Sequence, residues 1–269
     1  MDVRSTASPC VGFVVASALV LTLVATACGD DDEPAAAVEQ LVVRVVGEYP
    51  HDPASFTQGL VLHDGSLYES AGGYGESSLR EVDPDSGAVI RQVAVPAALF
   101  AEGLALVDDR LIQLTWKENT ALVYDVDTFE QVDTFSYGGE GWGLCATDNA
   151  LFMSDGSGRL TERDPVTFEP RASIDVTNQE APVDELNELE CIDGSVYANV
   201  LRSDTILEID PGTGDVVAEI DASGLLAADE RAALSSEPVL NGIADAGDGR
   251  LYLTGKLWPS MFEVELVPA

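Results

Sequence analysis

The sequence predicts an all-β fold, a five-bladed β-propeller whose last blade is closed by the N-terminal strand. Two observations predict it: one phrase of short strands recurs five times, and an unpaired strand precedes the first copy. Self-similarity at a period of about 40–45 residues is typical of propeller blades. The chain has 269 residues, of which 46% are apolar. A single all-β domain of this size is common, so one propeller can account for most of the chain.

The repeated phrase is an apolar run, an Asp- or Gly-rich turn and a second strand. Its copies begin at Gly59, Gly103, Gly143, Glu188 and Gly242, with start-to-start spacings of 44, 40, 45 and 54 residues. A second pair of alternating strands around a turn follows the first four copies, at residues 79–89, 122–132, 160–170 and 206–216. This is hairpin chemistry. Each repeat therefore supplies four short antiparallel strands, which is the content of one blade.

The two ends of the chain complete the count of strands. The fifth unit stops after its third strand, at residues 261–266, and the apolar segment 41–46 has no partner in sequence. We expect this N-terminal strand to complete the last blade, because ring closure removes an unpaired sheet edge. The long last interval contains residues 223–234, whose Ser start and Ala, Leu, Glu and Arg content predict a short helix.

The first 39 residues are not part of the predicted propeller, which spans 40–269. Arg4 precedes an uncharged run at 11–27, and the sequence VATAC at 24–28 resembles a bacterial lipobox. We read 1–27 as a lipoprotein signal peptide, Cys28 as the lipidated mature N-terminus and 28–39 as an acidic tether. The alternative is an ordinary secretory signal cleaved nearby. The expected location is outside the cell, anchored by lipid to the outer face of a bacterial membrane or in the periplasm.

Charge and residue counts exclude several classes of partner. The formal net charge is −35, from 48 acids and 13 bases, so the surface repels nucleic acid. His51 and His63 are the only histidines, which nearly excludes a multi-His metal site. A closed acidic ring favours a monomer. Cys145 and Cys191 each lie near the start of a repeat, and two buried thiols are favoured over a disulfide because equivalent positions in adjacent blades tend to be too far apart.

Chemically active residues gather where the innermost strands begin. Five repeats deliver aromatic, carboxylate and amide side chains to this layer: Phe56, Thr57, Gln58, Phe100, Glu102, Glu140, Trp142, Asn187, Glu188 and Asn241. Trp116 and Lys256 leave the second strands on the same side. A carboxylate near tryptophans and a lysine is a plausible acid–base site, because burial raises a carboxyl pKa and a nearby ammonium lowers it. Taken singly, each of these residues has a structural explanation.

Several motifs in this layer resemble the plant and bacterial glutaminyl cyclase family. They are FTQGL at 56–60, YES at 68–70 with SSLR at 77–80, EGL at 102–104, QLTW at 113–116, GWGL at 141–144, SDG at 154–156, LNELE at 186–190, and LNGI at 240–243 with GKLWP at 255–259. They occur in order from about residue 40 to 266. The resemblance implies a five-bladed propeller that converts N-terminal glutamine of peptides or proteins to pyroglutamate, without a metal or other cofactor.

The same resemblance implies the roles of individual residues. Glu102 falls on the catalytic glutamate, with Lys256 and Asn187 as further catalytic residues, while substrate-binding positions fall on Phe56, Gln58, Phe100, Trp116 and Trp142. One position departs from the family, since Leu201 replaces an aromatic residue. Two alternatives stay open: a lipoprotein that binds partners at the propeller mouth without catalysis, and a metal-dependent lactonase using Glu102, Glu140, Glu188 and Asn241.

Overall fold

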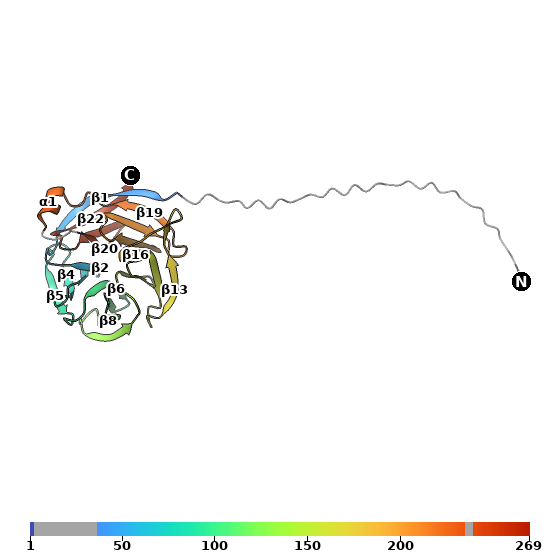
Figure 1. Cartoon of the computed structure of the whole chain (residues 1–269), viewed down its shortest axis with the longest axis horizontal. Coiled ribbons are helices and arrows are strands. Elements are labelled where there is room, and N and C mark those ends of the chain that lie inside the picture. The colour runs from blue at the N-terminus through green and yellow to red at the C-terminus, as the bar shows by residue number, and fades with distance from the viewer. Residues whose placement is uncertain (3–36, 235–238) are drawn as a thin grey trace. The chain divides into compact units, whose positions relative to one another are not determined.

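The computed structural model describes residues 1–2, 37–234 and 239–269. Residues Ala35–Ala269 form one compact unit, which contains all the described strands and the helix (Figure 1). The predicted signal peptide, Cys28 and most of the tether lie outside the described residues. In the part of the chain that the structure does describe, no helix has the length and apolar character to span a bilayer.

Three separate sheets each contain four antiparallel strands in sequence order. The first group is β2 (Thr57–His63), β3 (Ser66–Ala71), β4 (Ser78–Val82) and β5 (Val89–Ala94). The second is β6 (Ala101–Val107), β7 (Arg110–Thr115), β8 (Thr120–Asp125) and β9 (Gln131–Ser136). The third is β10 (Leu144–Ala146), β11 (Leu151–Ser154), β12 (Arg159–Arg163) and β13 (Pro170–Asp175). The four-stranded repeat predicted from the sequence is thus confirmed for these units.

An eight-stranded sheet joins the last two groups. Its order is β16 (Leu186–Ile192), β17 (Ser195–Val200), β18 (Thr205–Ile209), β19 (Val216–Asp221), β1 (Glu39–Pro50), β22 (Ser260–Pro268), β21 (Arg250–Gly255) and β20 (Leu240–Gly247). β1 runs antiparallel to β22, so the prediction that the N-terminal strand completes the last unit is confirmed. β1 also pairs in parallel with β19, which the sequence did not predict.

The first strands of the groups lie side by side. β2 contacts β6, β6 contacts β10, β10 contacts β16, β16 contacts β20, and β20 contacts β2 again. These strands lie towards the middle of the view, with β5, β13 and β19 at the periphery (Figure 1). The apolar clusters follow the same cycle, because each joins two successive groups. One packs Leu60 and Val82 of the first group against Ala244 and Met261 of the last. Burial between groups therefore stabilises a closed cyclic arrangement.

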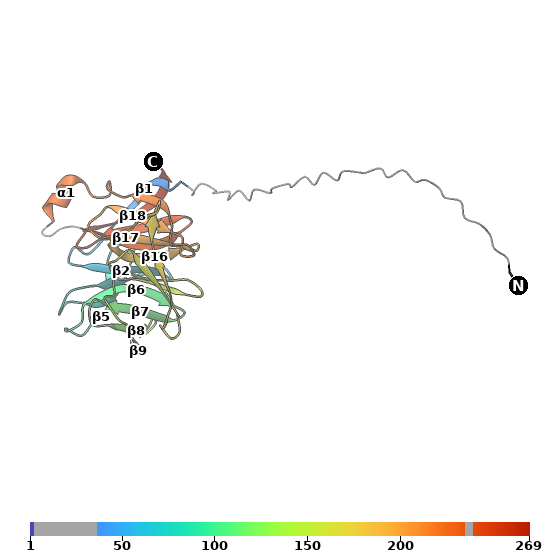
Figure 2. The same cartoon turned by 45° about the vertical axis from the view of Figure 1, so that its right-hand side comes forward.

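Two small elements lie outside the four-stranded groups. A hairpin of β14 (Thr177–Asn178) and β15 (Ala181–Pro182) follows β13 and was not predicted. The helix α1 (Ala228–Ala233) lies inside the predicted range but begins five residues later, at the edge of the strands (Figure 2). Its start is displaced because Leu225 and Leu226 are buried in the core between the last two groups. The backbone N–H of Ala227 then donates to the Glu230 carboxylate, which caps the first turn.

The prediction of two free thiols is wrong, because Cys145 and Cys191 form a disulfide. Their Cα atoms are 5.4 Å apart, within the range that a disulfide can bridge. Two features explain the error. Neighbouring first strands β10 and β16 pack directly against each other. The two positions are also not equivalent, since Cys145 lies two residues after Gly143 whereas Cys191 lies three after Glu188.

Candidate functional site

The residues predicted to be functional line one cavity of about 280 Å³. Its lining comprises Phe56, Gln58, Phe100, Glu102, Trp116, Trp142, Asn187, Leu201 and Lys256. All eight residues that the sequence placed in the site are therefore brought together, and Leu201 forms part of the wall. The predicted lipidation residue, Cys28, lies outside the described residues.

Local irregularities in the first strands aim the polar side chains at this cavity. The register between the first and second strands shifts at Gln58, at Glu102, at Asn187 and at Asn241, near the start of each first strand. A bulge leaves one or two residues unpaired and redirects them, which is a common device next to active sites. The sequence signal is a polar residue placed one or two positions before the apolar run.

Glycines near the starts of the first strands let adjacent first strands approach closely. A Cβ on Gly103 would lie 2.7 Å from the carbonyl oxygen of Trp142, and one on Gly143 would lie 2.1 Å from that of Asn187. No side chain fits at such distances. The recurring Gly at the start of the repeats is thus explained by close packing around the centre of the ring, and it places the pocket residues on a rigid support.

Glu102 is the buried carboxyl group of the cavity, with 6% of its surface exposed. Nε2 of Gln58 donates to its Oε1 at 3.2 Å. Burial raises the pKa of Glu102 well above its ordinary value; the Lys256 charge acts in the opposite direction, and Glu140 and Glu118 add to the increase. The pKa of Glu102 is thus shifted in the direction that favours service as both general acid and general base.

Lys256 supplies an ammonium group to the lining of the same cavity, and it is also 6% exposed. Burial lowers the pKa of Lys256, while the charges of Glu102 and Glu188 raise it. Its Nζ lies 5.0 Å from the centroid of the Phe56 ring, within cation–π range. Nδ2 of Asn187 is buried and makes no hydrogen bond to any residue that the structure describes. The cavity wall thus carries a cation and a free amide donor.

Aromatic rings form the rest of the wall. Phe56, Phe100 and Trp116 make successive edge-to-face contacts, with centroids 6.2 and 5.7 Å apart. Tyr74, which was not predicted from the sequence, has its ring edge-on to Phe100 at 5.3 Å, and its side chain is exposed. Tyr74 lies in the turn GGYG at 72–75, which follows β3. Trp116 follows β7 in the same way, at the equivalent end of the second strand of the next group. That aromatic residue between glycines was a signal available in the sequence.

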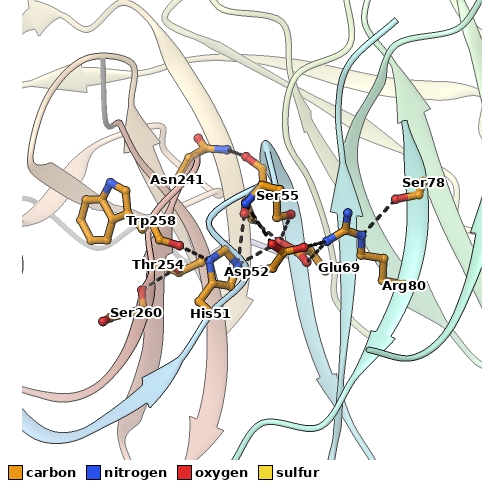
Figure 3. A network of polar contacts seen from close by, with 12 residues as sticks. His51, Asp52, Ser55, Glu69, Ser78, Arg80, Asn241, Thr254, Trp258 and Ser260 are labelled. Carbon is orange, nitrogen blue, oxygen red and sulfur yellow. Dashed lines mark hydrogen bonds and ion pairs between the residues drawn. The ribbon is translucent and has the colours of Figure 1, made fainter. Parts of the chain in front are cut away.

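A polar network supports the Phe56 side of the cavity (Figure 3). Oε1 of Glu69 accepts hydrogen bonds from the hydroxyls of Ser55 (2.6 Å) and Thr57 (2.7 Å), the residues on either side of Phe56. Nε2 of His51 lies 3.1 Å from the same oxygen, and its Nδ1 lies 2.7 Å from the carbonyl oxygen of Trp258. Because both ring nitrogens face acceptors, His51 is an imidazolium here.

The charges in this network stabilise each other. Burial opposes ionisation of Glu69, but His51 and the two hydroxyls lower the pKa of Glu69 to about 2. Although burial acts to lower the pKa of His51, Glu69 raises it. Arg80 closes the far side through a 2.8 Å ion pair with Asp52. The network joins the segment before β2 to the loop after Lys256, and so links two parts of the pocket that are distant in sequence.

A second cavity and the possible metal-binding groups complete the description of the described residues. A larger cavity of about 850 Å³ lies at the opposite ends of the first strands, and its lining includes Asp108, Asp148 and Asp193 but none of the predicted functional residues. Within residues 37–234 and 239–269, no group of three or more His, Cys, Asp or Glu side chains is arranged to hold a metal ion.

Comparisons with known proteins give consistent results. The family model for glutamine cyclotransferase matches residues 15–266. The chain is 40% identical to a glutaminyl-peptide cyclotransferase of Arabidopsis thaliana over 230 residues, which are 84% of this chain and 72% of the relative. Its fold is similar to the crystal structure of a Myxococcus xanthus glutaminyl cyclase, with a TM-score of 0.81 and 41% identity over 86% of this chain and 99% of the other.

Proposed function

Because this chain belongs to the glutamine cyclotransferase family, we propose that it converts the N-terminal glutamine of peptides or proteins to pyroglutamate and releases ammonia. The observation that carries the proposal is the pairing of a buried carboxyl group, Glu102, with a buried ammonium group, Lys256, in one cavity walled by aromatic rings. A non-catalytic binding site would not need both charges to be buried.

The ring of first strands supports a five-bladed propeller as the scaffold. Each four-stranded group forms one blade, and the parallel pairing of β1 with β19 joins the outer strands of the last two blades. The cyclic contacts of β2, β6, β10, β16 and β20 surround the axis. In this arrangement the pocket is at one mouth of the channel, where side chains from every blade can converge.

The reaction needs a proton to be moved from the α-nitrogen of the N-terminal glutamine to its side-chain amide nitrogen. The α-nitrogen of glutamine attacks its own γ-carboxamide carbon, a C–N bond closes a five-membered lactam, and the bond to the amide nitrogen breaks. The α-amine attacks in its neutral form. As the C–N bond forms, the Glu102 carboxylate takes a proton from this nitrogen and then delivers it to the leaving nitrogen, which departs as ammonia. The enzyme starts and ends with the same number of protons. General acid–base catalysis of this kind typically contributes about 10²–10⁴-fold.

The remaining polar groups bind the substrate and stabilise charge. Lys256 and the free Nδ2 of Asn187 donate to the amide oxygen, where negative charge develops as the lactam forms. Gln58 fixes the orientation of Glu102. The aromatic walls exclude water and hold the glutamine side chain folded over its own amine, which lowers the entropic cost of cyclisation. Leu201 replaces a ring on one wall, so that side offers less stacking surface.

No step in this mechanism requires a metal ion, and we propose that the reaction is metal-independent. Two residues of the lactonase alternative are already engaged as partners of other groups. Oε2 of Glu140 accepts hydrogen bonds from the indole N–H groups of Trp116 and Trp142, and Nδ2 of Asn241 donates to the Thr57 carbonyl at 2.9 Å. Treatment with a chelator should leave ammonia release unchanged; loss of activity that a divalent cation restores would contradict this.

The test is replacement of Glu102→Gln, which keeps the oxygen that accepts from Gln58 but cannot exchange a proton. We expect kcat on a Gln-initiated dipeptide to fall by about 10²–10⁴-fold. Ammonia release and the loss of the mass of one ammonia from the peptide are the measurements. Glu188→Gln is the matched control, since Glu188 is equally buried but does not line the cavity. Unchanged turnover in Glu102→Gln would refute the assignment.

The N-terminal predictions are part of the same proposal. We propose a secreted, monomeric protein held to the membrane by a lipid on Cys28, based on the lipobox-like sequence at 24–28. Mass spectrometry of the mature protein should find an acylated cysteine at its N-terminus. A mature N-terminus without a lipid would remove the anchor and leave the enzymatic proposal untouched.

A further inference from the structure

The two tryptophans of the pocket share one hydrogen-bond acceptor. Nε1 of Trp116 donates to Oε2 of Glu140 at 2.7 Å, and Nε1 of Trp142 donates to the same oxygen at 3.0 Å. Trp116 follows β7 and Trp142 precedes β10, so the two rings come from adjacent groups of strands. A single carboxylate oxygen therefore connects two walls of the cavity.

The surroundings of Glu140 keep it ionised. Although burial acts to raise the pKa of Glu140, the two indole N–H groups and Lys117 lower it. Nζ of Lys117 lies 3.5 Å from the other oxygen, Oε1, and 3.6 Å from the centroid of the Trp116 ring. Hydrogen bonds to a charged acceptor are shorter and stronger than those between neutral groups. The carboxylate, the two indoles and the ammonium thus form one cluster at the edge of the cavity.

The backbone of each tryptophan is held by other contacts. The N–H of Trp116 donates to the carbonyl of Phe100 at 2.9 Å, and that of Trp142 donates to the carbonyl of Ser154 at 3.1 Å. The carbonyl of Trp142 accepts from Gly103 at 2.7 Å. The orientation of each indole ring has a further constraint, the hydrogen bond to Glu140, which adds to ring contacts such as that of Trp116 with Phe100. A partly buried indole N–H usually finds an acceptor, and here the shared acceptor helps to orient both rings.

We propose that Glu140 is a positioning residue: it holds Trp116 and Trp142 at a fixed mutual angle so that the two rings grip the glutamine side chain of the substrate. The inference rests on the proposed function for its substrate, and it adds a role that needs no contact between Glu140 and the reacting atoms. It also assigns Lys117 a place as the cation that keeps the Glu140 carboxylate in position.

The test separates the acceptor oxygen from the negative charge. Glu140→Ala removes both, whereas Glu140→Gln keeps an oxygen that can accept from both indoles. Glu118→Gln is a matched control: Glu118 also raises the pKa of Glu102 through its charge, but its carboxylate accepts hydrogen bonds from the Tyr74 hydroxyl and from the backbone N–H groups of Phe100 and Lys117, not from an indole. All variants are made in the full chain and assayed with a Gln-initiated dipeptide.

Kinetics should distinguish the variants as follows. In Glu140→Ala the kcat/KM should fall about tenfold, with most of the change in a higher KM, because the two rings hold the substrate before the lactam forms. In Glu140→Gln the KM should stay close to that of the wild type. Both Glu140→Gln and Glu118→Gln should shift the acidic limb of the kcat/KM profile to lower pH, because each removes a charge that raises the pKa of Glu102.

The indole N–H signals in a nitrogen–proton NMR spectrum give a readout that does not need activity. The chain has three tryptophans, and the third, Trp258, has a buried Nε1 with no partner among the described residues, so it serves as an internal reference. In Glu140→Ala the signals of Trp116 and Trp142 should move together while that of Trp258 stays. Unmoved signals, or a wild-type KM, would overturn the proposal. If the wild type itself released no ammonia, the proposed function would fall while the NMR result would still decide the role of Glu140.

Discussion

The disulfide between Cys145 and Cys191 gives a prediction whose size follows from the structure. The bond closes a loop of 46 residues and links the first strands β10 and β16. In the chain-entropy treatment, closing a loop of this length removes enough freedom from the unfolded chain to stabilise the fold by about 4 kcal/mol. For a domain of this size, that difference corresponds to a fall in Tm of about 10 °C when the bond is broken.

Two perturbations should give the same result. Reduction of the wild-type protein should lower the Tm by about 10 °C, and the double variant Cys145→Ala with Cys191→Ala should show the lower Tm with or without reductant. Thermal unfolding followed by circular dichroism measures the Tm, and a thiol titration of the denatured protein confirms that reduction exposes two additional thiols. Turnover at 25 °C should be almost unchanged, because neither cysteine lines the substrate cavity.

Complete reduction with no change in Tm would refute the stabilising role of the disulfide. That result would mean that residual contacts in the unfolded chain already restrict the loop between Cys145 and Cys191, so that the covalent bond adds little stability. A double variant less stable than the reduced wild type would instead measure the packing of the side chains, because Cys145 is almost fully buried.

Three other changes test the support of the pocket. Glu69→Gln should lower the free energy of unfolding by about 3 kcal/mol at pH 7, because it leaves the His51 imidazolium buried without its carboxylate; urea titrations should show the difference shrink as the pH falls from 4.5 to about 2, and a difference that persists at pH 2 would contradict this. Gly143→Ala should lower both Tm and kcat/KM, since its Cβ would force β10 away from β16; a variant with wild-type values for both would show that the strands can adjust. Lys256→Met should move the acidic limb of the kcat/KM profile to higher pH, because the ammonium lowers the pKa of Glu102; a shift in the other direction would show that the limb belongs to another group.

Much of the fold could be predicted because its information is local. Alternating strands around Asp- and Gly-rich turns specify each group, and the unpaired segment at 41–46 indicated how the last group is completed. Contacts between groups were not predictable in the same way. The parallel pairing of β1 with β19 and the distance between Cys145 and Cys191 depend on how closely two groups approach, and no short sequence pattern records that distance.

The residues of the site also differ in how far the sequence could predict them. A polar residue before each apolar run marks the bulge that directs Gln58, Glu102 and Asn187 into the cavity, so their meeting could be inferred from the repeat. The partners that hold these residues could not. Glu140 was expected as one more carboxylate of the layer and as a ligand in the lactonase alternative. Its hydrogen bonds to two indoles depend on side-chain orientations that the sequence does not specify.

Glu69 and Glu102 are both buried, yet their environments shift their pKa values in opposite directions. Glu69 receives donors from two hydroxyls and an imidazolium, so its pKa is lowered and its charge stabilises the fold above its ordinary pKa. Among the described residues the Glu102 carboxyl group accepts one hydrogen bond, from Gln58. Its raised pKa means that its charge is a cost to folding, which grows as the pH rises above its ordinary pKa. A carboxylate surrounded by donors would be a poor base, because those donors hold it in the charged form. The scarcity of donors around Glu102 suits the role proposed for it, in which it takes a proton from one nitrogen and returns it to another.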